Sequence, residues 1–258
     1  MILMKSIEIF VATHKKFDFP LKQGYIPIQC GAKINKKLGY LKDDKGINIS
    51  YKNPNYCELT VIYYMWKNIK KDKVLGLCHY RRYFYKNIFK SKKNILSKND
   101  IDKITNKYDI ILPMPYYFNI SVENNYDVKH HIKDLLECKN IIKKKYPEFE
   151  TSFDIVLKKK WAYCFNMIIA KKEFFDDYCN WLFDILFDLE KKIDISKYDD
   201  YNKRVFGFIS ERLLNVYIEK NKDKLKIKEL PVYNIEEPLF KQRLGIIKRK
   251  MLRFIGFN

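Results

Sequence analysis

The chain has 258 residues, and its 51 lysine and arginine residues against 31 aspartate and glutamate residues give a formal net charge of +20 at pH 7. Its hydrophobic content of 47% and aromatic content of 16% exclude a disordered chain, and its length predicts one large domain or two small ones. No apolar run approaches the roughly 18 residues of a membrane-spanning helix, and the cysteines include no C-x-x-C pair, which excludes zinc-ribbon and thioredoxin-like sites.

The first third of the chain alternates apolar runs with turn residues. Ser6–Thr13 and Tyr25–Cys30 are apolar and rich in β-branched residues, which predicts two buried strands. The N-terminal stretch lacks a small-residue cleavage site, so we expect a strand rather than a signal peptide, and free cysteine thiols in a reducing cytoplasm. Asn53-Pro54 is a helix-start signal, with Asn53 as the cap of a helix over Asn55–Lys67. Lys73–Cys78 is predicted to form a third strand.

The remaining two thirds continue this alternation. The predicted elements are, in order, a helix over Ser97–Asn106, a strand over Tyr108–Met114, a basic helical region over Val122–Tyr146, a strand over Ala162–Ala170, helices over Lys172–Lys191 and Arg204–Lys220, a strand over Leu230–Tyr233 and a tail helix over Leu239–Phe257. The pattern predicts an α/β fold in which helices flank a central, mostly parallel sheet. No repeat or linker divides it, so we expect a single domain over residues 1–238 and a tail over residues 239–258.

Polar residues follow several predicted strands, at the edge where open α/β sheets bind ligands. Thr13-His14-Lys15 follow the first strand and Pro113–Phe118 end the fourth, but His79–Phe84 (HYRRYF) is the densest group. A guanidinium group matches phosphate oxygens with two parallel hydrogen bonds. Strand geometry sends Arg81 and Arg82 to opposite faces, so we expect only one of them to face a ligand. The alternative for Arg82 is an ion pair at the sheet edge.

Three further polar residues lie on predicted helices and strands. Glu58, on an otherwise apolar helix, either holds an arginine of His79–Phe84 or lies in solvent. Asn166 interrupts an apolar strand and needs hydrogen-bond partners there, so it either ties down a loop or binds a sugar hydroxyl. Glu211, expected near the start of a helix, is either a general base of raised pKa or ordinary compensation of the helix dipole. The residues alone leave each choice open.

A metal that offsets the charge of a diphosphate is often held by Asp-x-Asp after a strand. The triplet Asp100-Ile101-Asp102 stands at a predicted helix start instead, so we do not expect it to bind a metal. Neither a P-loop nor a G-x-G-x-x-G motif occurs in the sequence. Kinases, P-loop NTPases and dinucleotide-dependent oxidoreductases therefore lose their usual support.

Seven segments together carry a family resemblance. They are IFVATHK, YIPIQCGA, NISYKNPNYCELTVIYYMWKN, GLCHYRRYF, YDIILP, CFNMIIAKKEFFDDYCNWLFDIL and GFISERLLNVYI, in that order. With them the chain resembles a family of bacterial capsular and exopolysaccharide glycosyltransferases, long filed as a domain of unknown function, some of whose members are galactofuranosyltransferases. The resemblance covers Ile7–Tyr233, which is nearly the whole chain except the basic tail.

The resemblance implies a GT-A-like fold and a division of the site. The residues it assigns to the nucleotide sugar are Ala12, Thr13, His14, Lys15, Tyr80, Arg81 and Arg82. GT-A enzymes carry Asp-x-Asp where this chain has His79-Tyr80-Arg81-Arg82, so guanidinium groups or His79 would meet the diphosphate, and metal dependence is in doubt. Glu211 lies where inverting enzymes place their base. The expected catalytic residues are Glu211, His79 and Arg81, and the expected acceptor-side or supporting residues are Asn53, Glu58, Asp109 and Asn166.

The implied function is transfer of a hexosyl group from a UDP-sugar to a lipid-linked or surface-polysaccharide acceptor, in capsule, O-antigen or exopolysaccharide synthesis. The positive charge is also compatible with a nucleic-acid-binding module or a non-catalytic membrane scaffold. The alternative is a lysine-rich composition produced by AT-rich codon usage, without selection for binding. The aromatic residues follow core periodicity and no nucleic-acid-binding motif occurs, so we do not expect nucleic acid as a partner.

The tail over residues 239–258 (LFKQRLGIIKRKMLRFIGFN) has six basic residues and no acidic one. On a helix its apolar residues gather on one face, which is the pattern of a helix lying in the headgroup region of an anionic leaflet. We therefore expect a cytoplasmic protein, peripheral on the inner face of the bacterial plasma membrane. The alternative is that the apolar stripe packs on the catalytic domain.

Overall fold

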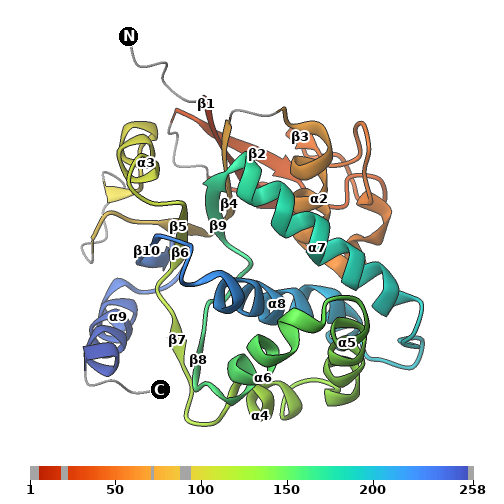
Figure 1. Cartoon of the computed structure of the whole chain (residues 1–258). Coiled ribbons are helices and arrows are strands. Elements are labelled where there is room, and N and C mark those ends of the chain that lie inside the picture. Colours follow the sequence, from red (N-terminus) through yellow and green to blue (C-terminus); the bar gives the residue numbers. More distant parts are fainter. Residues whose placement is uncertain (1–5, 19–22, 71–72, 88–93, 255–258) are drawn as a thin grey trace.

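The computed structural model describes residues 6–18, 23–70, 73–87 and 94–254. Within these residues nine strands form one sheet, whose main path has the order β10-β6-β9-β4-β1-β2-β3, while β5 and β11 pair at the end of β4 (Figure 1). A separate small sheet consists of β7 and β8. The strands are β1 (Ser6–Thr13), β2 (Tyr25–Gln29), β3 (Leu41–Lys42), β4 (Lys73–His79), β5 (Arg82–Phe84), β6 (Ile110–Pro113), β7 (Tyr116–Tyr117), β8 (Trp161–Ala162), β9 (Ile168–Lys171), β10 (Ile227–Leu230) and β11 (Val232–Asn234).

Parallel pairs dominate the large sheet. Strand β1 is parallel to β2 and β4, β2 to β3, and β6 to β10, whereas β9 is antiparallel to β4 and β6. The predicted α/β fold with a mostly parallel central sheet is therefore confirmed. Because Ala12 lies opposite His79 in the register of β1 and β4, the residues that follow these two strands meet at one edge.

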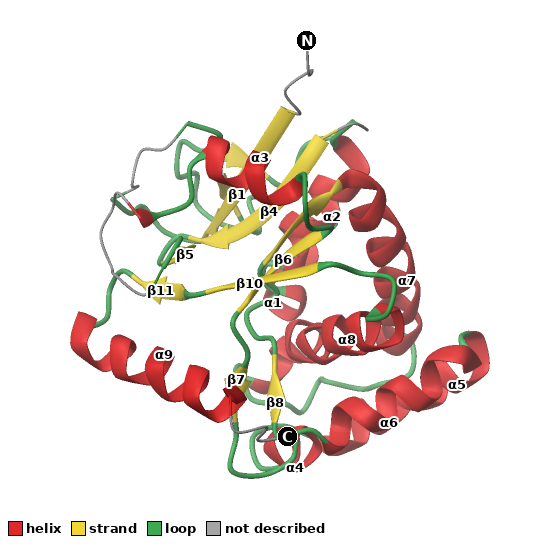
Figure 2. Cartoon of the chain, turned by 60° about the vertical axis from the view of Figure 1, so that its left-hand side comes forward, coloured by secondary structure: helices red, strands yellow, loops and turns green. Residues whose placement is uncertain are grey.

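Helices cover both faces of the sheet. They are α1 (Asn53–Tyr56), α2 (Leu59–Asn68), α3 (Lys98–Thr105), α4 (Val122–Asp127), α5 (Ile132–Lys145), α6 (Glu150–Lys158), α7 (Lys172–Glu190), α8 (Val205–Asn221) and α9 (Leu239–Phe254). In Figure 2, α2 and α7 lie on one side of the sheet and α3 on the other, while α9 runs along the outer edge below β11. Helices α2 and α7 thus cover one face and α3 the other, while α5 and α6 pack on α7 and α8.

Alternate residues of β1 point into two separate cores. Phe10 packs in the larger core, together with the apolar residues of α2 and α7. Ile9 and Val11 pack in the smaller core, which also contains Ile101 of α3 and Ile246 of α9. The period of two residues follows from the pleat of the strand, and it explains why the central strands read as continuous apolar runs.

The helix predicted over Asn55–Lys67 is interrupted at Cys57. The backbone of Cys57 has φ 51° and ψ −131°, so α1 ends there and α2 begins at Leu59. The sequence predicted Asn53 as the helix cap, but Asn53 is the first residue of α1. Its side-chain amide donates a hydrogen bond to the carbonyl oxygen of Cys57 at 2.8 Å, which helps to stabilise the interruption.

The strand predicted over Ala162–Ala170 is also interrupted. Phe165 and Asn166 have positive φ angles of 77° and 51°, which no regular strand allows. The chain therefore turns between β8, which pairs with β7, and β9, which pairs with β4 and β6. Asn166 belongs to this turn and not to the middle of a strand.

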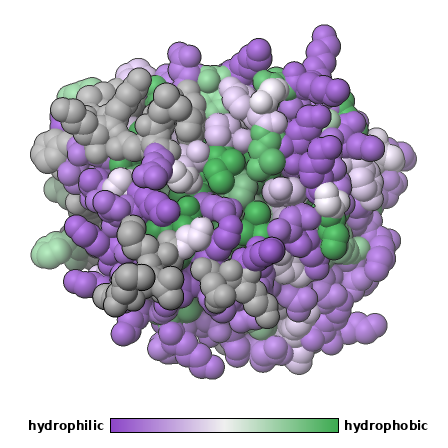
Figure 3. Space-filling model, turned by 90° about the horizontal axis from the view of Figure 1, so that it is seen from above, coloured by the Kyte–Doolittle hydropathy of each residue, from purple (hydrophilic) through white to green (hydrophobic). Residues whose placement is uncertain are grey.

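The predicted helical region over Val122–Tyr146 forms two helices, α4 and α5, and α6 was not predicted. The tail helix is confirmed as α9, although residues 255–258 lie outside the described part of the chain. Within the described residues no helix is both long and apolar enough to cross a membrane. The face seen from above Figure 1 is mostly hydrophilic, with apolar residues in small separate patches outside the grey atoms (Figure 3). The boundary at residue 238 between domain and tail remains a prediction.

Candidate active site

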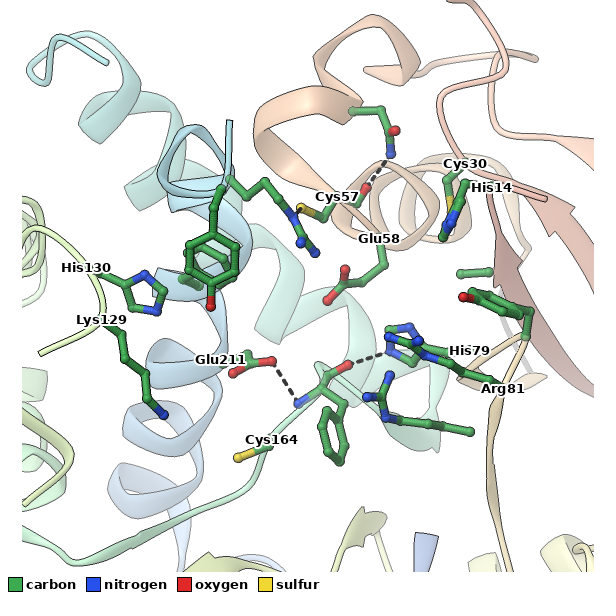
Figure 4. A pocket seen from close by; sticks show the side chains of 18 of the residues that line it. His14, Cys30, Cys57, Glu58, His79, Arg81, Lys129, His130, Cys164 and Glu211 are labelled. Atoms are coloured by element: carbon green, nitrogen blue, oxygen red, sulfur yellow. Dashed lines mark hydrogen bonds between the residues drawn. The ribbon is translucent and has the colours of Figure 1, made fainter. Parts of the chain in front are cut away.

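A cavity of about 670 Å³ lies at the carboxyl edge of β1 and β4. Its walls are the residues that follow these strands, the start of α1 and α2, the loop between α4 and α5, and the first turns of α8 (Figure 4). His14 and His79, which we expected at the same sheet edge, both line it. The cavity will be called the main cavity.

Cationic side chains outnumber carboxylates in the main cavity. Among the described residues that line it, the carboxylates are Glu58 and Glu211, and the permanent cations are Arg81, Arg82, Lys129, Arg204 and Arg212. A cleft with this excess of positive charge attracts anionic ligands, because its low-dielectric walls focus the field. The lining therefore favours a ligand such as a diphosphate.

The segment His79–Phe84 is a tight hairpin and not a continuous strand. His79 at the end of β4 pairs with Arg82 at the start of β5, so Tyr80 and Arg81 form the two-residue turn. Both arginines consequently line the main cavity, so the alternation of a strand does not separate them as the sequence predicted. Which of them faces a ligand stays a prediction. The guanidinium carbon of Arg82 lies 4.4 Å from the ring centroid of Phe165. Burial, and then the charge of Arg81, lower the pKa of Arg82.

Arg81 keeps part of its guanidinium group available. Its Nη1 lies 3.6 Å from Oε2 of Glu236, at an exposed ion pair. Its Nε is buried, and no group in the described part of the chain accepts a hydrogen bond from it. A buried N–H without a partner is uncommon in folded proteins, so this donor is available to a bound ligand.

His79 is held by the turn between β8 and β9. Its Nε2 lies 2.7 Å from the carbonyl oxygen of Phe165. Because a carbonyl oxygen only accepts, Nε2 carries the proton and Nδ1 is the unprotonated nitrogen. Burial lowers the pKa of His79 from 6.5 to about 4, so the ring is neutral at pH 7. His79 therefore brings no positive charge to the cavity.

The same turn also holds both carboxylates of the cavity. The backbone N–H of Phe165 donates to Oε1 of Glu211 at 2.9 Å, and Nδ2 of Asn166 donates to Oε1 of Glu58 at 2.8 Å. Ser210 donates to Oδ1 of Asn166 at 3.1 Å, so the buried amide is satisfied on both sides. Asn166 thus ties down a loop, which is one of the two alternatives left open for it. Strained backbone held by so many contacts is typical of functional sites.

Glu58 and Glu211 both point into the main cavity (Figure 4). Burial raises the pKa of each above its usual range, and the charge of Glu58 contributes to the shift of Glu211. Glu211 lies beyond the first turn of α8, so it does not compensate the dipole at the start of that helix. Glu58 is half-buried, and its hydrogen bond comes from Asn166 and not from an arginine of His79–Phe84. Two carboxylates of raised pKa in one cavity are candidates for proton transfer.

The last residues of β1 and His14 after it form the wall beside the hairpin. Ala12, Thr13 and His14 line the main cavity, and the ring of His14 lies 5.3 Å from that of Tyr80. Lys15 points outward to Glu236, with 3.2 Å between Nζ and Oε1, and does not line the cavity. Burial and the charge of Lys15 lower the pKa of His14.

Asn53 and Asp109, both expected at the acceptor side, lie at opposite edges of the sheet. Asn53 lines the main cavity. Asp109 stands at the amino end of β6, where its carboxylate accepts the backbone N–H of Lys226 at 2.9 Å. Because ligand-binding loops gather at the carboxyl edge, the structure does not bring Asp109 to the site, and this expectation is wrong.

The residues at the end of β4 do not fit a divalent cation. The guanidinium groups of Arg81 and Arg82 have no lone pair to offer a metal. Asp100, of the triplet Asp100-Ile101-Asp102, accepts hydrogen bonds from Ser97 in a capping box at the start of α3. In the described residues no three His, Cys, Asp or Glu side chains gather closely enough to hold a metal ion. Metal independence stays a prediction.

Several residues of the main cavity were missed by the sequence analysis. The ring of His130 stacks on Phe208 with 4.1 Å between centroids, and burial lowers its pKa to about 4. Nε of Arg204 lies 3.1 Å from Sγ of Cys57, the residue of strained backbone. The doublet His130-His131 holds half of the chain's four histidines, and this was the one signal that could have pointed to it.

Comparisons with known proteins place the chain in a family and match it to a solved structure. A family described as a domain of unknown function (DUF4422) matches residues 8–222. A comparison with curated proteins gives no match. Among solved structures, the apo structure of the WbbM bifunctional glycosyltransferase matches with a TM-score of 0.83 and 32% identity, over 90% of this chain and 46% of that one. The chain thus spans about half the length of the protein it matches.

Proposed function

The chain belongs to the family described as a domain of unknown function (DUF4422), and from its likeness to WbbM we propose that it is a glycosyltransferase with a nucleotide-sugar donor. Its GT-A-like fold, shared with WbbM at 32% identity, supports a transferase. The observation that carries the proposal is the combination of cationic side chains and carboxylates of raised pKa in the main cavity. A diphosphate needs the former, and activation of a hydroxyl group needs the latter.

Arg81 and Arg82 hold the diphosphate of a UDP-sugar in this proposal. The buried Nε of Arg81 is a donor that no described residue uses. The nucleoside is contacted by the residues at the same end of the cavity, which are Ala12, Thr13, His14 and Tyr80. Lys15, which lies over the ring of Tyr80, adjoins this end and also contacts the nucleoside. The negative charge that develops on the leaving diphosphate is then met by guanidinium groups.

Glu211 is the proposed general base. The acceptor hydroxyl gives its proton to the Glu211 carboxylate while its oxygen attacks the anomeric carbon of the donor. The bond from that carbon to the diphosphate oxygen breaks, and UDP leaves with the electron pair. A raised pKa makes Glu211 a stronger base than an exposed glutamate. His79 acts as a positioning residue, because it holds Phe165, whose N–H in turn holds Glu211.

The proposed reaction transfers a hexosyl group, with galactofuranosyl as the specific candidate, to a lipid-linked or surface-polysaccharide acceptor. Helix α9 supports a membrane location on the cytoplasmic face. Its exposed apolar residues follow one another at spacings of three and four, and they are Phe240, Leu244, Ile247, Met251 and Phe254. Lys241, Arg243 and Lys248 lie among them, and each basic residue near an anionic leaflet adds about 1 kcal/mol of attraction.

Thermal unfolding with added UDP tests the donor site. At 100 times its Kd, UDP stabilises the folded protein by about 2.7 kcal/mol, which raises the Tm of a chain of this size by roughly 5–10 °C. UMP is expected to stabilise less, because it lacks the second phosphate. Arg81→Gln should weaken UDP binding about tenfold or more, since a charged hydrogen bond contributes about 1.5–3 kcal/mol.

Lys248→Gln is the matched control, because it removes a positive charge from the exposed part of α9. It should leave the UDP shift unchanged. An unchanged Tm of the wild-type protein at millimolar UDP would contradict the proposed donor. Equal UDP shifts for Arg81→Gln and the wild type would remove Arg81 from the diphosphate site.

A further inference from the structure

A second cavity, of about 300 Å³, adjoins the main one. It lies between α9, β7 and the β5–β11 pair. Its lining includes Arg82, Tyr116, Phe165, Glu237, Lys241 and Arg249. Arg82 and Phe165 line both cavities, so the two spaces meet at this pair.

Arg249 supplies this second cavity with a donor. Its guanidinium carbon lies 4.3 Å from the ring centroid of Tyr116, so the group is fixed over an aromatic face. Its Nε is buried and, within the described residues, donates to no acceptor. A buried guanidinium N–H is costly unless something accepts from it, which indicates a place for a ligand oxygen.

The charge of the second cavity is positive. Of the described residues that line it, Arg82, Lys241 and Arg249 are cationic and Glu237 is the one carboxylate. Glu237 already accepts a hydrogen bond from Nδ2 of Asn234 at 2.8 Å. The remaining positive charge suits an anionic group such as a phosphate.

Helix α9 is fastened where it forms this wall. Nε2 of Gln242 donates to the carbonyl oxygens of Asn234 and Glu237 at 2.8 and 2.9 Å, and Oε1 accepts the N–H of Asn234 at 2.7 Å. Ile246, one turn further along, is fully buried in the smaller core. The second cavity is thus built by specific contacts and is not a gap beside a loose tail.

We propose that the second cavity binds a phosphate group carried by the acceptor, with Arg249 and Lys241 as its ligands. This proposal rests on the proposed function. The donor's diphosphate has its own arginines in the main cavity, which leaves the cations on α9 for the other substrate. An acceptor whose phosphate lies beside Arg249 extends past Phe165 toward the carboxylates of the main cavity.

The test is a calorimetric titration of inorganic pyrophosphate into the full-length protein saturated with UDP. Arg249→Gln should bind pyrophosphate about tenfold or more weakly than the wild type, since a charged hydrogen bond contributes on that order. Lys248→Gln, which removes the neighbouring but exposed charge on α9, should bind it as the wild type does. All three proteins should bind UDP equally.

Farnesyl diphosphate as a second probe identifies the source of the phosphate. Tighter binding than pyrophosphate, lost in Arg249→Gln, supports a lipid-linked acceptor, and equal binding of the two probes supports a soluble phosphorylated glycan. Absence of pyrophosphate binding under UDP saturation overturns the proposal, as does equal weakening by Arg249→Gln and Lys248→Gln. If UDP itself does not bind, the proposed function fails. Pyrophosphate is then titrated without UDP into the wild type, Arg249→Gln and Arg81→Gln. This titration still decides whether pyrophosphate binding depends on Arg249.

Discussion

Glu211 is half-buried and has a fixed orientation. The Phe165 N–H holds one of its oxygens, while Nη1 of Arg212 lies 3.4 Å from the other. Burial raises the pKa of this carboxyl, although Arg212 opposes the shift. Glu58, held by Asn166, has a raised pKa for the same main reason. The two carboxylates differ in what holds them, and this difference makes their roles separable by substitution.

Glu211→Gln should lower kcat/KM by about 10²–10⁴-fold if Glu211 is the base, because a general base contributes on that order. The base must be ionised, so wild-type kcat/KM should fall as the pH drops through the raised pKa of Glu211, above the ordinary 4.5 of a glutamate. The pKa of Glu211 is higher in the folded than in the unfolded protein, so its negative charge lowers the free energy of unfolding at a pH above the folded-state pKa. This destabilisation disappears as the pH falls toward 4.5. Glutamine lacks this cost, so Tm at pH 7 should not decrease.

The measurements are pH–rate profiles and thermal melts of both proteins. Glu58→Gln is the matched control, since glutamine can still accept from Asn166, and its loss of activity should be smaller. Near wild-type turnover of Glu211→Gln would exclude Glu211 as the base.

At the scale of single residues, the sequence identified His79, Arg81, Arg82, Glu58 and Glu211 because each is a polar residue next to an apolar run. It could not identify their partners. The hydrogen bonds of His79 and Glu211 are made with the backbone of Phe165. Because nearly every residue has a backbone carbonyl and N–H group, the residue type of Phe165 does not predict these bonds. Asp109 precedes β6 and therefore lies at the amino end of that strand, away from the main cavity.

At the scale of elements, two interruptions shape the site. Cys57 separates α1 from α2, and the Phe165–Asn166 turn separates β8 from β9. The hydrophobic periodicity is continuous across both interruptions, so the sequence predicted one helix over Asn55–Lys67 and one strand over Ala162–Ala170. Neither interruption contains glycine or proline, the residues that usually mark such breaks. Tertiary contacts hold the positive φ angles of Cys57 and Phe165, which local propensity disfavours. Asparagine adopts such angles more readily, so Asn166 was the one local signal.

The strain at Cys57 predicts different stabilities for two small substitutions. Glycine tolerates φ 51° and ψ −131°, whereas alanine does not, and both remove the thiol from Arg204. Strained backbone costs on the order of 1–3 kcal/mol, and the greater unfolded-state entropy of glycine offsets about 0.5–1 kcal/mol of this. Cys57→Gly should therefore be more stable than Cys57→Ala by about 1 kcal/mol. The free energy of unfolding in urea measures the difference, and a more stable alanine variant would show that the backbone is not strained.

At the scale of the whole molecule, α9 has one face packed on the body of the protein and another exposed. Ile246 is buried against the body, whereas Phe240 is 75% and Phe254 93% exposed. The sequence predicted the amphipathic helix, and it left open whether the apolar stripe meets a membrane or packs on the domain. Part of α9 does pack on the body, but through a residue between the exposed ones. A single sequence could not separate the two faces, because both are apolar.

Substitution of the exposed stripe is a cleaner membrane test than deletion of the tail, which would also remove Ile246 and a wall of the second cavity. Phe240→Ser, Leu244→Ser and Met251→Ser together should abolish most co-sedimentation with vesicles that contain phosphatidylglycerol. Each large side chain that inserts fully contributes about 1.5–3 kcal/mol, whereas exposed substitutions change folding stability by less than about 0.5 kcal/mol.

Ile34→Ser with Ile47→Ser is the control, because both isoleucines are exposed on a different part of the molecule. The control protein should sediment with the vesicles as the wild type does. Unchanged sedimentation of the triple variant would place the membrane contact elsewhere, or show that there is none.

Arg82 and Phe165 are the common wall of the two cavities. One guanidinium group cannot offer the same N–H groups to an anion on each side. A ligand that draws Arg82 toward itself therefore alters the affinity for a ligand on the other side. Thermodynamic linkage makes this effect reciprocal, so each ligand changes the Kd of the other by the same factor. Substrates bound on the two sides of Arg82 are thus coupled energetically, and the release of one product changes how tightly the other is held.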